Sequence, residues 1–181
     1  CAAGRAQRQG SGRFFHIARI RGLKECFWVI CAPVATANGG TYMKIGALAE
    51  VFPGENRVAM TPDSAVQLAK LGHSCVVQAG AGAKAGFSDA SYAAAGVEVL
   101  ADAGAVVAAA DVLVKVRGPE VAEAEALREG QTLISFFWPA QNPELLEIVR
   151  ARGATVIAMD MVPRISRAQK MDALSSMANI A

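Results

Sequence analysis

The chain has 181 residues, about one domain in length, and 53% of them are hydrophobic while 19% are charged. This composition is typical of a globular α/β protein with a sizeable core. The formal net charge of +2 is unevenly distributed: residues 1–42 contain six basic residues and one acidic residue, which leaves 12 basic and 15 acidic for residues 43–181. The second part is therefore mildly acidic, and it gives no sign of a nucleic-acid partner.

Cysteine and histidine are scarce after residue 42. Three of the four cysteines lie in residues 1–42 and only Cys75 lies in residues 43–181, so we expect no intrachain disulfide and a reducing compartment. Two histidines in the whole chain are a poor supply for a zinc site or a His-based triad, and we expect no metal. No run of 18 uncharged apolar residues occurs, so we expect that this segment does not span a membrane.

Residues 1–42 differ in character from the rest. They show no sustained amphipathic period, and Met43 looks like an ordinary protein start. Three interpretations stay open: upstream or non-native sequence, an Arg-rich transit peptide, or a secretory signal peptide with an apolar run at 27–32 and a cleavage site at 35–37. The first is the one we expect, because the cysteine-poor remainder argues against secretion.

From Met43 onward, strands and helices are predicted to alternate. In chain order they are strand 44–49, helix 61–72, strand 73–79, helix 88–95, strand 97–100, helix 101–110, strand 111–116, helix 119–129, strand 132–137, helix 142–152, strand 155–159 and helix 167–181. The strands are continuous apolar runs. This pattern predicts an α/β fold, an open and mostly parallel sheet with helices on both faces in a flavodoxin/Rossmann-like arrangement, and leaves the strand order open.

Local signals mark the helix ends. Thr61, Pro62 and Asp63 offer an N-cap hydroxyl, a first-turn proline and an acid near the positive end of the helix dipole. Gly72 is expected to end that helix, and Gly130 is expected to stop the helix at 119–129.

A polar stripe follows the last predicted strand. On a helix, its members fall at steps of three and four: Gln169, Asp172, Ser175, Ser176 and Asn179. From spacing alone, the solvated face of an ordinary amphipathic helix explains such a stripe. Its side chains are short amides, hydroxyls and carboxylates, which suit fixed hydrogen bonds to a ligand. Ligands in open α/β sheets bind outside the carboxyl ends of the strands, where this segment lies.

Four blocks of sequence resemble known families. Residues 164–181 and 136–145 are similar to segments of proton-translocating transhydrogenases, whereas 55–62 and the block around Lys115 are shared with the related alanine dehydrogenases. The resemblance covers residues 43–181, and it implies an N-terminal domain whose last helix leads to a dinucleotide-binding domain beyond Ala181. No G-x-G-x-x-G fingerprint occurs within the chain.

The transhydrogenase resemblance implies a nicotinamide site. In that family, the positions matching Arg164, Gln169, Asp172 and Ser175 face the nicotinamide of bound NAD(H). Arg164 and Asp172 would hold each other, Ser175 would bind the carboxamide, and Gln169 would reach toward the second nucleotide. Gln169 and Asp172 are thus the implied catalytic residues, since direct hydride transfer needs alignment rather than a general base.

The resemblance also implies partners and a location. The complete complex would contain a beta subunit that binds NADP(H), a membrane domain that moves protons and a homodimer of the alpha component. It would lie peripherally on the cytoplasmic face of the inner membrane, or on the matrix side in mitochondria. Residues 1–181 alone are expected to be inactive.

Two alternatives remain open, and the first is an alanine dehydrogenase-like, NAD-dependent oxidoreductase. In alanine dehydrogenases, a histidine that accepts a proton occupies the position of Trp138, and tryptophan cannot serve that role. The positions matching Arg57 and Lys115 hold the substrate carboxylate in that family, so here they are a substrate site or a structural remnant. The second alternative is a non-catalytic dimerisation or docking module.

Three further features receive structural interpretations. Residues 46–55 depart from both families, which leaves the geometry of the first loop open. The glycine-rich loop 80–86 does not match a phosphate-binding motif and is expected to be a tight turn. Cys75 is expected to be a buried apolar residue, and His73 a partly exposed residue at the start of a strand.

Overall fold

The computed structural model describes residues 42–163 and 165–173, all of which belong to the compact unit Cys31–Ala181. Their strands form one six-stranded parallel sheet in the order β3-β2-β1-β4-β5-β6. The strands are β1 Lys44–Ala47, β2 Ser74–Gln78, β3 Glu98–Leu100, β4 Val112–Arg117, β5 Thr132–Phe136 and β6 Thr155–Ala158. The predicted α/β fold with a parallel sheet is confirmed.

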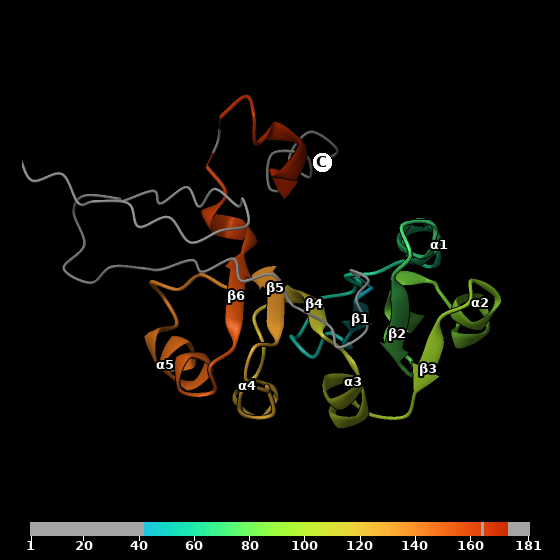
Figure 1. Cartoon of the computed structure of the whole chain (residues 1–181), viewed down its shortest axis with the longest axis horizontal. Coiled ribbons are helices and arrows are strands. Elements are labelled where there is room, and N and C mark those ends of the chain that lie inside the picture. Colours follow the sequence, from blue (N-terminus) through green and yellow to red (C-terminus); the bar gives the residue numbers. More distant parts are fainter. Residues whose placement is uncertain (1–41, 164, 174–181) are drawn as a thin grey trace, which may run out of the picture. The chain divides into compact units, whose positions relative to one another are not determined.

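Helices cover both faces of the sheet, as Figure 1 shows. α1 and α2 lie on one face, and α3, α4 and α5 lie on the other. This division follows from right-handed crossovers, because the chain first moves outward from β1 to β3 and then returns to β4 before moving to β6. The helices are α1 Pro62–Lys70, α2 Asp89–Ala94, α3 Ala103–Ala109, α4 Val121–Glu125 and α5 Pro143–Ala151, with short 3₁₀ turns η1 Ala83–Ala85, η2 Met159–Met161 and η3 Gln169–Met171.

The strand order places a topological switch point between β1 and β4. The connections leaving these two adjacent strands run to opposite sides, which opens a crevice at the edge of the sheet where strands end. We call this edge, with the segments that follow each strand, the carboxyl edge. Because all six strands are parallel, the residues after β1, β4, β5 and β6 meet there.

Each face of the sheet has its own apolar core. Leu48, Val76 and Leu113 pack with buried residues of α3, α4 and α5, whereas Ala47 and Val77 pack on the side of α1 and α2. The close packing of α3 explains the glycine in β1. A Cβ atom on Gly46 would lie 2.8 Å from Ala110 Cβ, so only glycine fits under the helix without a shift.

The predicted start and end of α1 are confirmed. The Thr61 hydroxyl accepts from the Ser64 amide at 3.2 Å, and the Ser64 hydroxyl accepts from the Thr61 amide at 2.9 Å, which forms a capping box with Pro62 at the first turn. Gly72 follows the helix with φ +90°, a left-handed conformation that glycine adopts without strain.

α4 is shorter than predicted. It ends at Glu125 instead of continuing to Glu129. The backbone amide of Arg128 donates to the side-chain oxygen of Gln131 at 3.0 Å, and Leu127 is buried in the core. A side-chain acceptor therefore replaces the helical carbonyl, and the chain turns toward β5 before it reaches Gly130.

The start of the predicted helix 167–181 is also corrected. Residues 166–168 form a turn and η3 is a single 3₁₀ turn, so the first α-helical residue described is Ala173. Gln169 and Asp172 therefore do not lie on one α-helical face, and the stripe predicted from a period of 3.6 does not apply to them. Ser175, Ser176 and Asn179 lie outside the described residues.

None of the helices formed by the described residues has the length and hydrophobicity needed to cross a bilayer.

Candidate functional site at the carboxyl edge

Glu50 fills the switch point between β1 and β4. Its side chain is 5% exposed and accepts hydrogen bonds from two successive amides at the end of β4, that of Val116 at 2.6 Å and that of Arg117 at 3.3 Å. Burial raises the pKa of this carboxyl, although the two amides and Lys115 act in the opposite direction. The side chain that occupies the crevice is thus a carboxylate tied to the backbone of the neighbouring strand.

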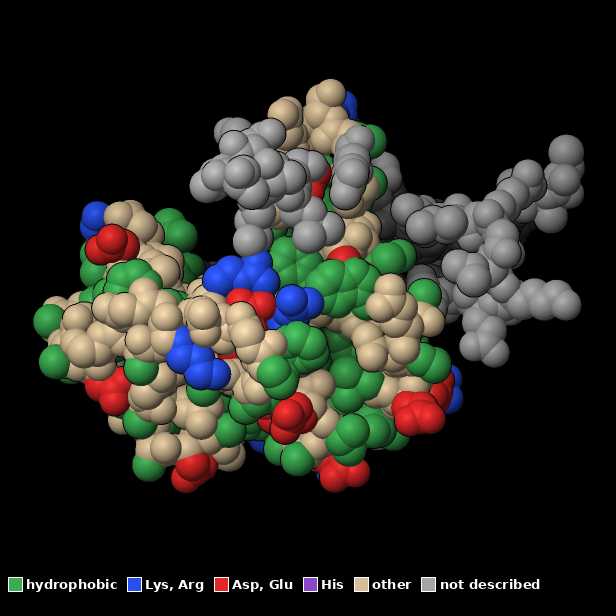
Figure 2. Space-filling model, turned by 180° about the vertical axis from the view of Figure 1, so that it is seen from behind, with side chains coloured by type: hydrophobic (Ala, Val, Ile, Leu, Met, Phe, Trp, Pro, Cys, Tyr) green, Lys and Arg blue, Asp and Glu red, His purple; other side chains and the backbone are tan. Residues whose placement is uncertain are grey.

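Glu55 joins two arginines at the same edge. Its carboxylate accepts hydrogen bonds from Nε and Nη2 of Arg57, each at 2.6 Å, and from Nε of Arg117 at 3.0 Å. Hydrogen bonds from Arg57 contribute most to holding the pKa of Glu55 at about 2, and the same pairing raises the pKa of Arg57. Figure 2 shows basic and acidic side chains grouped near the middle of one face, beside hydrophobic ones.

Lys115, which the sequence marks as a candidate carboxylate ligand, points into the protein. Its ammonium lies 2.6 Å from the Glu123 carboxylate, and its side chain is 1% exposed. Glu123 also accepts from the backbone amide of Glu120 at 2.8 Å, as part of the capping box of α4. The lysine is therefore neutralised by an acid eight residues away on the following helix.

Trp138, in the loop just after β5, has an unusual backbone conformation. Its φ of +47° is the only positive value among the non-glycine residues that the structure describes. Its ring stacks on Phe136 with centroids 5.7 Å apart, and the guanidinium carbon of Arg117 lies 5.8 Å from its centroid and 4.9 Å from that of Phe52. The arginine is thus flanked by two aromatic rings as well as bound to a carboxylate.

Asp160 connects the ends of β5 and β6. It lies in η2, and its two carboxylate oxygens accept from the amides of Phe137 at 2.7 Å and Trp138 at 3.2 Å. In the same loop, the Asn142 side chain donates to the carbonyls of Phe137 and Trp138 at 2.9 and 3.2 Å. Asn142 precedes α5 as predicted, but its side chain holds this loop and makes no cap hydrogen bond.

Two of the four predicted nicotinamide-facing residues are described. Gln169 lies in η3 with an exposed side chain, and Asp172 follows it with a side chain only 8% exposed. Both belong to the segment after β6, on the carboxyl edge. Arg164 and Ser175 lie outside the described residues, so the predicted contact between Arg164 and Asp172 remains a prediction.

The glycine-rich loop 80–86 forms a tight turn around η1, as predicted. Gly80 and Gly86 have φ values of +73° and +85°, and the Gly80 amide donates to the Asp89 carboxylate at 2.9 Å. This amide is therefore already bonded to an acid and does not offer a free donor to a phosphate.

The two remaining sequence candidates have structural roles, as predicted. Cys75 is a free, buried thiol whose pKa is raised by burial, and His73 accepts from the Met43 amide at 3.3 Å just before β2. Within the part of the chain that the structure describes, no group of three or more His, Cys, Asp or Glu side chains could hold a metal ion.

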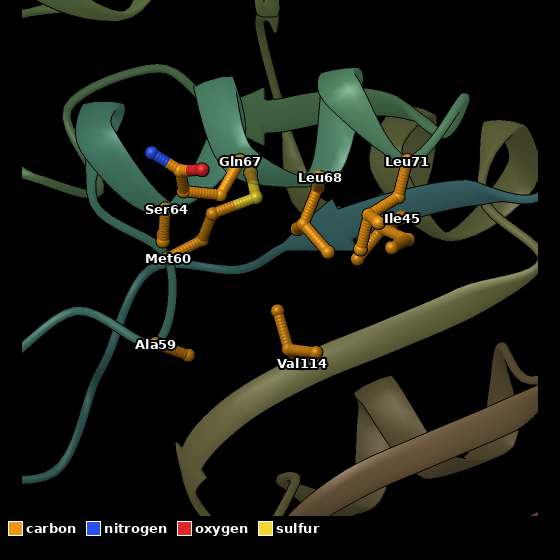
Figure 3. A pocket seen from close by; sticks show the side chains of 8 residues that line it. All are labelled: Ile45, Ala59, Met60, Ser64, Gln67, Leu68, Leu71 and Val114. Atoms are coloured by element: carbon orange, nitrogen blue, oxygen red, sulfur yellow. The ribbon is translucent and has the colours of Figure 1, made fainter.

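An apolar hollow of about 350 Å³ lies beside α1. Figure 3 shows side chains from α1, β1 and β4 around it, among them Leu68, Ile45 and Val114. None of its lining residues is charged, and the Ser64 hydroxyl at its rim is already bonded to Thr61. The hollow therefore offers little chemistry, and it contains none of the predicted site residues.

The sequence analysis missed several charged residues that hold the carboxyl edge together. The only sequence signals for them were the two acids inside loop 46–55, which departs from both families, and the second of these lies two residues before Arg57. Glu50 binds amides 66 and 67 residues away, Arg117 lies 62 residues from Glu55, and Asp160 binds amides 23 and 22 residues away, so spacing did not reveal these contacts. The missed residues are Glu50, Glu55, Arg117, Glu123 and Asp160.

Known proteins share this domain. The family model described as "Alanine dehydrogenase/PNT, N-terminal domain" matches residues 46–181. NAD(P) transhydrogenase subunit alpha of Cereibacter sphaeroides is 77% identical over 139 residues, which are 77% of this chain and 27% of that protein. Alanine dehydrogenase of Bacillus subtilis is 35% identical over 139 residues, 77% of this chain and 36% of that protein.

A solved structure of transhydrogenase from Sinorhizobium meliloti agrees with the fold, with a TM-score of 0.71 at 39% identity over 75% of this chain and 40% of that one. The chain thus spans between 27% and 40% of the length of these relatives. It belongs to the alanine dehydrogenase/PNT N-terminal domain family and corresponds to the N-terminal domain of transhydrogenase alpha subunits.

Proposed function

We propose that this chain is the first part of an alpha subunit that transfers hydride between NAD(H) and NADP(H), coupled to proton translocation across a membrane. The observation that carries the proposal is the internal neutralisation of the carboxyl edge. Arg57 is paired with Glu55 through two hydrogen bonds, and Lys115 is paired with Glu123. The two cations that hold a carboxylate substrate in alanine dehydrogenases are thus bound by acids of this chain, and Trp138 stands where a proton acceptor is needed.

The 77% identity to a protein named NAD(P) transhydrogenase subunit alpha supports the same reaction class. Alanine oxidation would require the chain to release Arg57 and Lys115 from their acids and to supply a base. Hydride transfer between two nicotinamides requires neither, because it depends on closeness and alignment.

In this proposal, the segment after β6 binds the nicotinamide. A carboxamide needs short donors and acceptors, and this segment offers the exposed amide of Gln169 and the carboxylate of Asp172. The bound nicotinamide supplies the hydride donor or acceptor. In the proposal, Arg164 and Asp172 orient each other, Ser175 binds the carboxamide, and Gln169 reaches toward the second nucleotide.

The described residues fit the pyrophosphate poorly. The most glycine-rich turn, loop 80–86, has its first amide bonded to Asp89. We therefore assign the pyrophosphate to a dinucleotide-binding domain beyond this chain, and residues 1–181 alone should be inactive. The NADP(H) site, the beta subunit, the membrane domain, a homodimer and a place on the cytoplasmic or matrix face of a membrane belong to the same proposal.

The test uses membranes from cells that express the complete reading frame together with the neighbouring subunit gene. NADPH-driven reduction of an NAD analogue is followed in parallel with the oxidation of L-alanine by NAD⁺. Analogue reduction without alanine oxidation supports the proposal. Alanine oxidation would overturn it and would make Arg57 and Lys115 the substrate site. The isolated 181-residue chain serves as the control that should show neither reaction.

A further inference from the structure

The carboxylate of Asp160 accepts from two successive backbone amides in the loop that follows β5. Its Oδ1 accepts from Phe137 at 2.7 Å and its Oδ2 from Trp138 at 3.2 Å, immediately after β5 ends. The amides of Phe137 and Trp138 lie beyond the last paired residues of β5, so they need acceptors outside the sheet ladder. Asp160 comes just after β6, and its two bonds therefore fix the end of β5 to the end of β6.

These bonds hold a backbone that is unfavourable by itself. A tryptophan with φ +47° is strained, because in this left-handed conformation its Cβ atom crowds the backbone. Glycine has no Cβ atom and avoids this contact. Such a conformation persists where the surroundings determine it. Here both sides of the loop are held, the amides by Asp160 and the carbonyls by Asn142.

The conformation of Trp138 determines where its ring lies. The ring stacks on Phe136 and lies over the guanidinium of Arg117, which in turn binds Glu55. Asp160 is thus linked through one loop to the charged cluster at the carboxyl edge. In the other direction along the chain, Asp160 begins the segment that carries Gln169 and Asp172.

We propose that Asp160 is a positioning residue: by binding the amides of Phe137 and Trp138, it fixes both the Trp138 ring and the start of the segment that follows β6 and carries Gln169 and Asp172. Its effect on hydride transfer rests on the proposed function, whereas its effect on the loop does not. Asp160 itself need not touch either nucleotide.

The loop is tested first, in the 181-residue chain, by hydrogen exchange. Asp160→Asn replaces one acceptor with a donor, so the Trp138 amide should exchange about tenfold faster or more. Asp111→Asn is the matched control. Asp111 also binds a backbone amide, that of Lys44 at 2.8 Å, but at the opposite edge of the sheet. The Asp111→Asn variant should speed exchange of the Lys44 amide and leave exchange of the Trp138 amide unchanged.

A spectroscopic readout follows the ring. The chain has two tryptophans, so Trp28→Phe leaves Trp138 as the only source of tryptophan fluorescence. In that background, Asp160→Asn should shift the Trp138 emission maximum, and Asp111→Asn should not. If Asp160→Asn does not fold, Asp160→Glu takes its place, and its displaced carboxylate should still speed exchange at Trp138 by about threefold or more. Unchanged exchange and emission in the folded variant would overturn the proposal.

Activity is measured in the complete protein with its partner subunit. Asp160→Asn should lower kcat for transhydrogenation about tenfold while the KM for each nucleotide changes less than about threefold, because alignment is lost and binding is kept. Asp111→Asn should retain both constants. If the wild type shows no transhydrogenation, the proposed function fails and the exchange result still decides the role of Asp160. If the wild type is active and both variants behave alike, the positioning role is wrong.

Discussion

The ammonium of Lys115 lies 2.6 Å from the carboxylate of Glu123, and the two side chains are 1% and 12% exposed. Lys115 comes from β4 and Glu123 from α4, so the pair also attaches that short helix to the sheet. Replacing one partner of such a buried ion pair strongly destabilises the fold, because the other charge stays buried without a partner.

Glu123→Gln should therefore lower the free energy of unfolding by about 3 kcal/mol, measured by urea denaturation. The double variant Lys115→Met with Glu123→Gln should recover at least half of that loss, since no charge remains buried. Equal losses in the single and double variants would mean that the Glu123 contact with the Glu120 amide, rather than the ion pair, matters.

Glu55 should make stability depend on acid pH. Its folded pKa of about 2 lies below the ordinary value of 4.5, so its ionised form is favoured in the folded state. The stabilisation it provides is fully present above about pH 4.5 and is lost as the pH falls toward 2. Urea unfolding of the wild type and of Glu55→Gln should therefore differ most above pH 4.5 and converge near pH 2. A difference that stays constant across this range would contradict the assignment.

Gly46 should not tolerate a side chain. A Cβ atom there would lie 2.8 Å from atoms of both Val106 and Ala110, which belong to α3 and its end. Gly46→Ala should cost about 1–3 kcal/mol through overpacking, measured as the shift in the urea midpoint. Gly118→Ala is the control, because its nearest contact would be at an ordinary 3.7 Å, and it should change stability by less than about 1 kcal/mol.

Gln169 should affect the reaction rather than the fold. Its side chain is exposed in η3, so Gln169→Ala should leave the unfolding free energy within about 0.5 kcal/mol of the wild type. In the assembled complex it should lower kcat for transhydrogenation at least about tenfold. Gln67→Ala removes another exposed glutamine, on α1, and should retain full activity. Equal activity in the two variants would remove Gln169 from the proposed site.

The alternation of strands and helices could be predicted from local patterns in the sequence. Apolar runs, the Thr61 cap and glycines such as Gly72 act through neighbours a few residues away, and those elements appear where they were predicted. Interactions of such short range depend on local sequence patterns, so they can be predicted from one sequence. The strand order was not determined in this way, because all of the strands are similar apolar runs.

The contacts at the carboxyl edge could not be predicted in this way, because they join groups that the fold brings together. Glu50 binds an amide 67 residues away and Asp160 binds one 22 residues away, and no local pattern selects such partners. The same reason explains the errors: the Gln131 side chain ends α4 early, and the segment after β6 turns before it becomes helical. Buried charges and loop amides must find partners in the folded protein, and the fold determines which groups lie within reach.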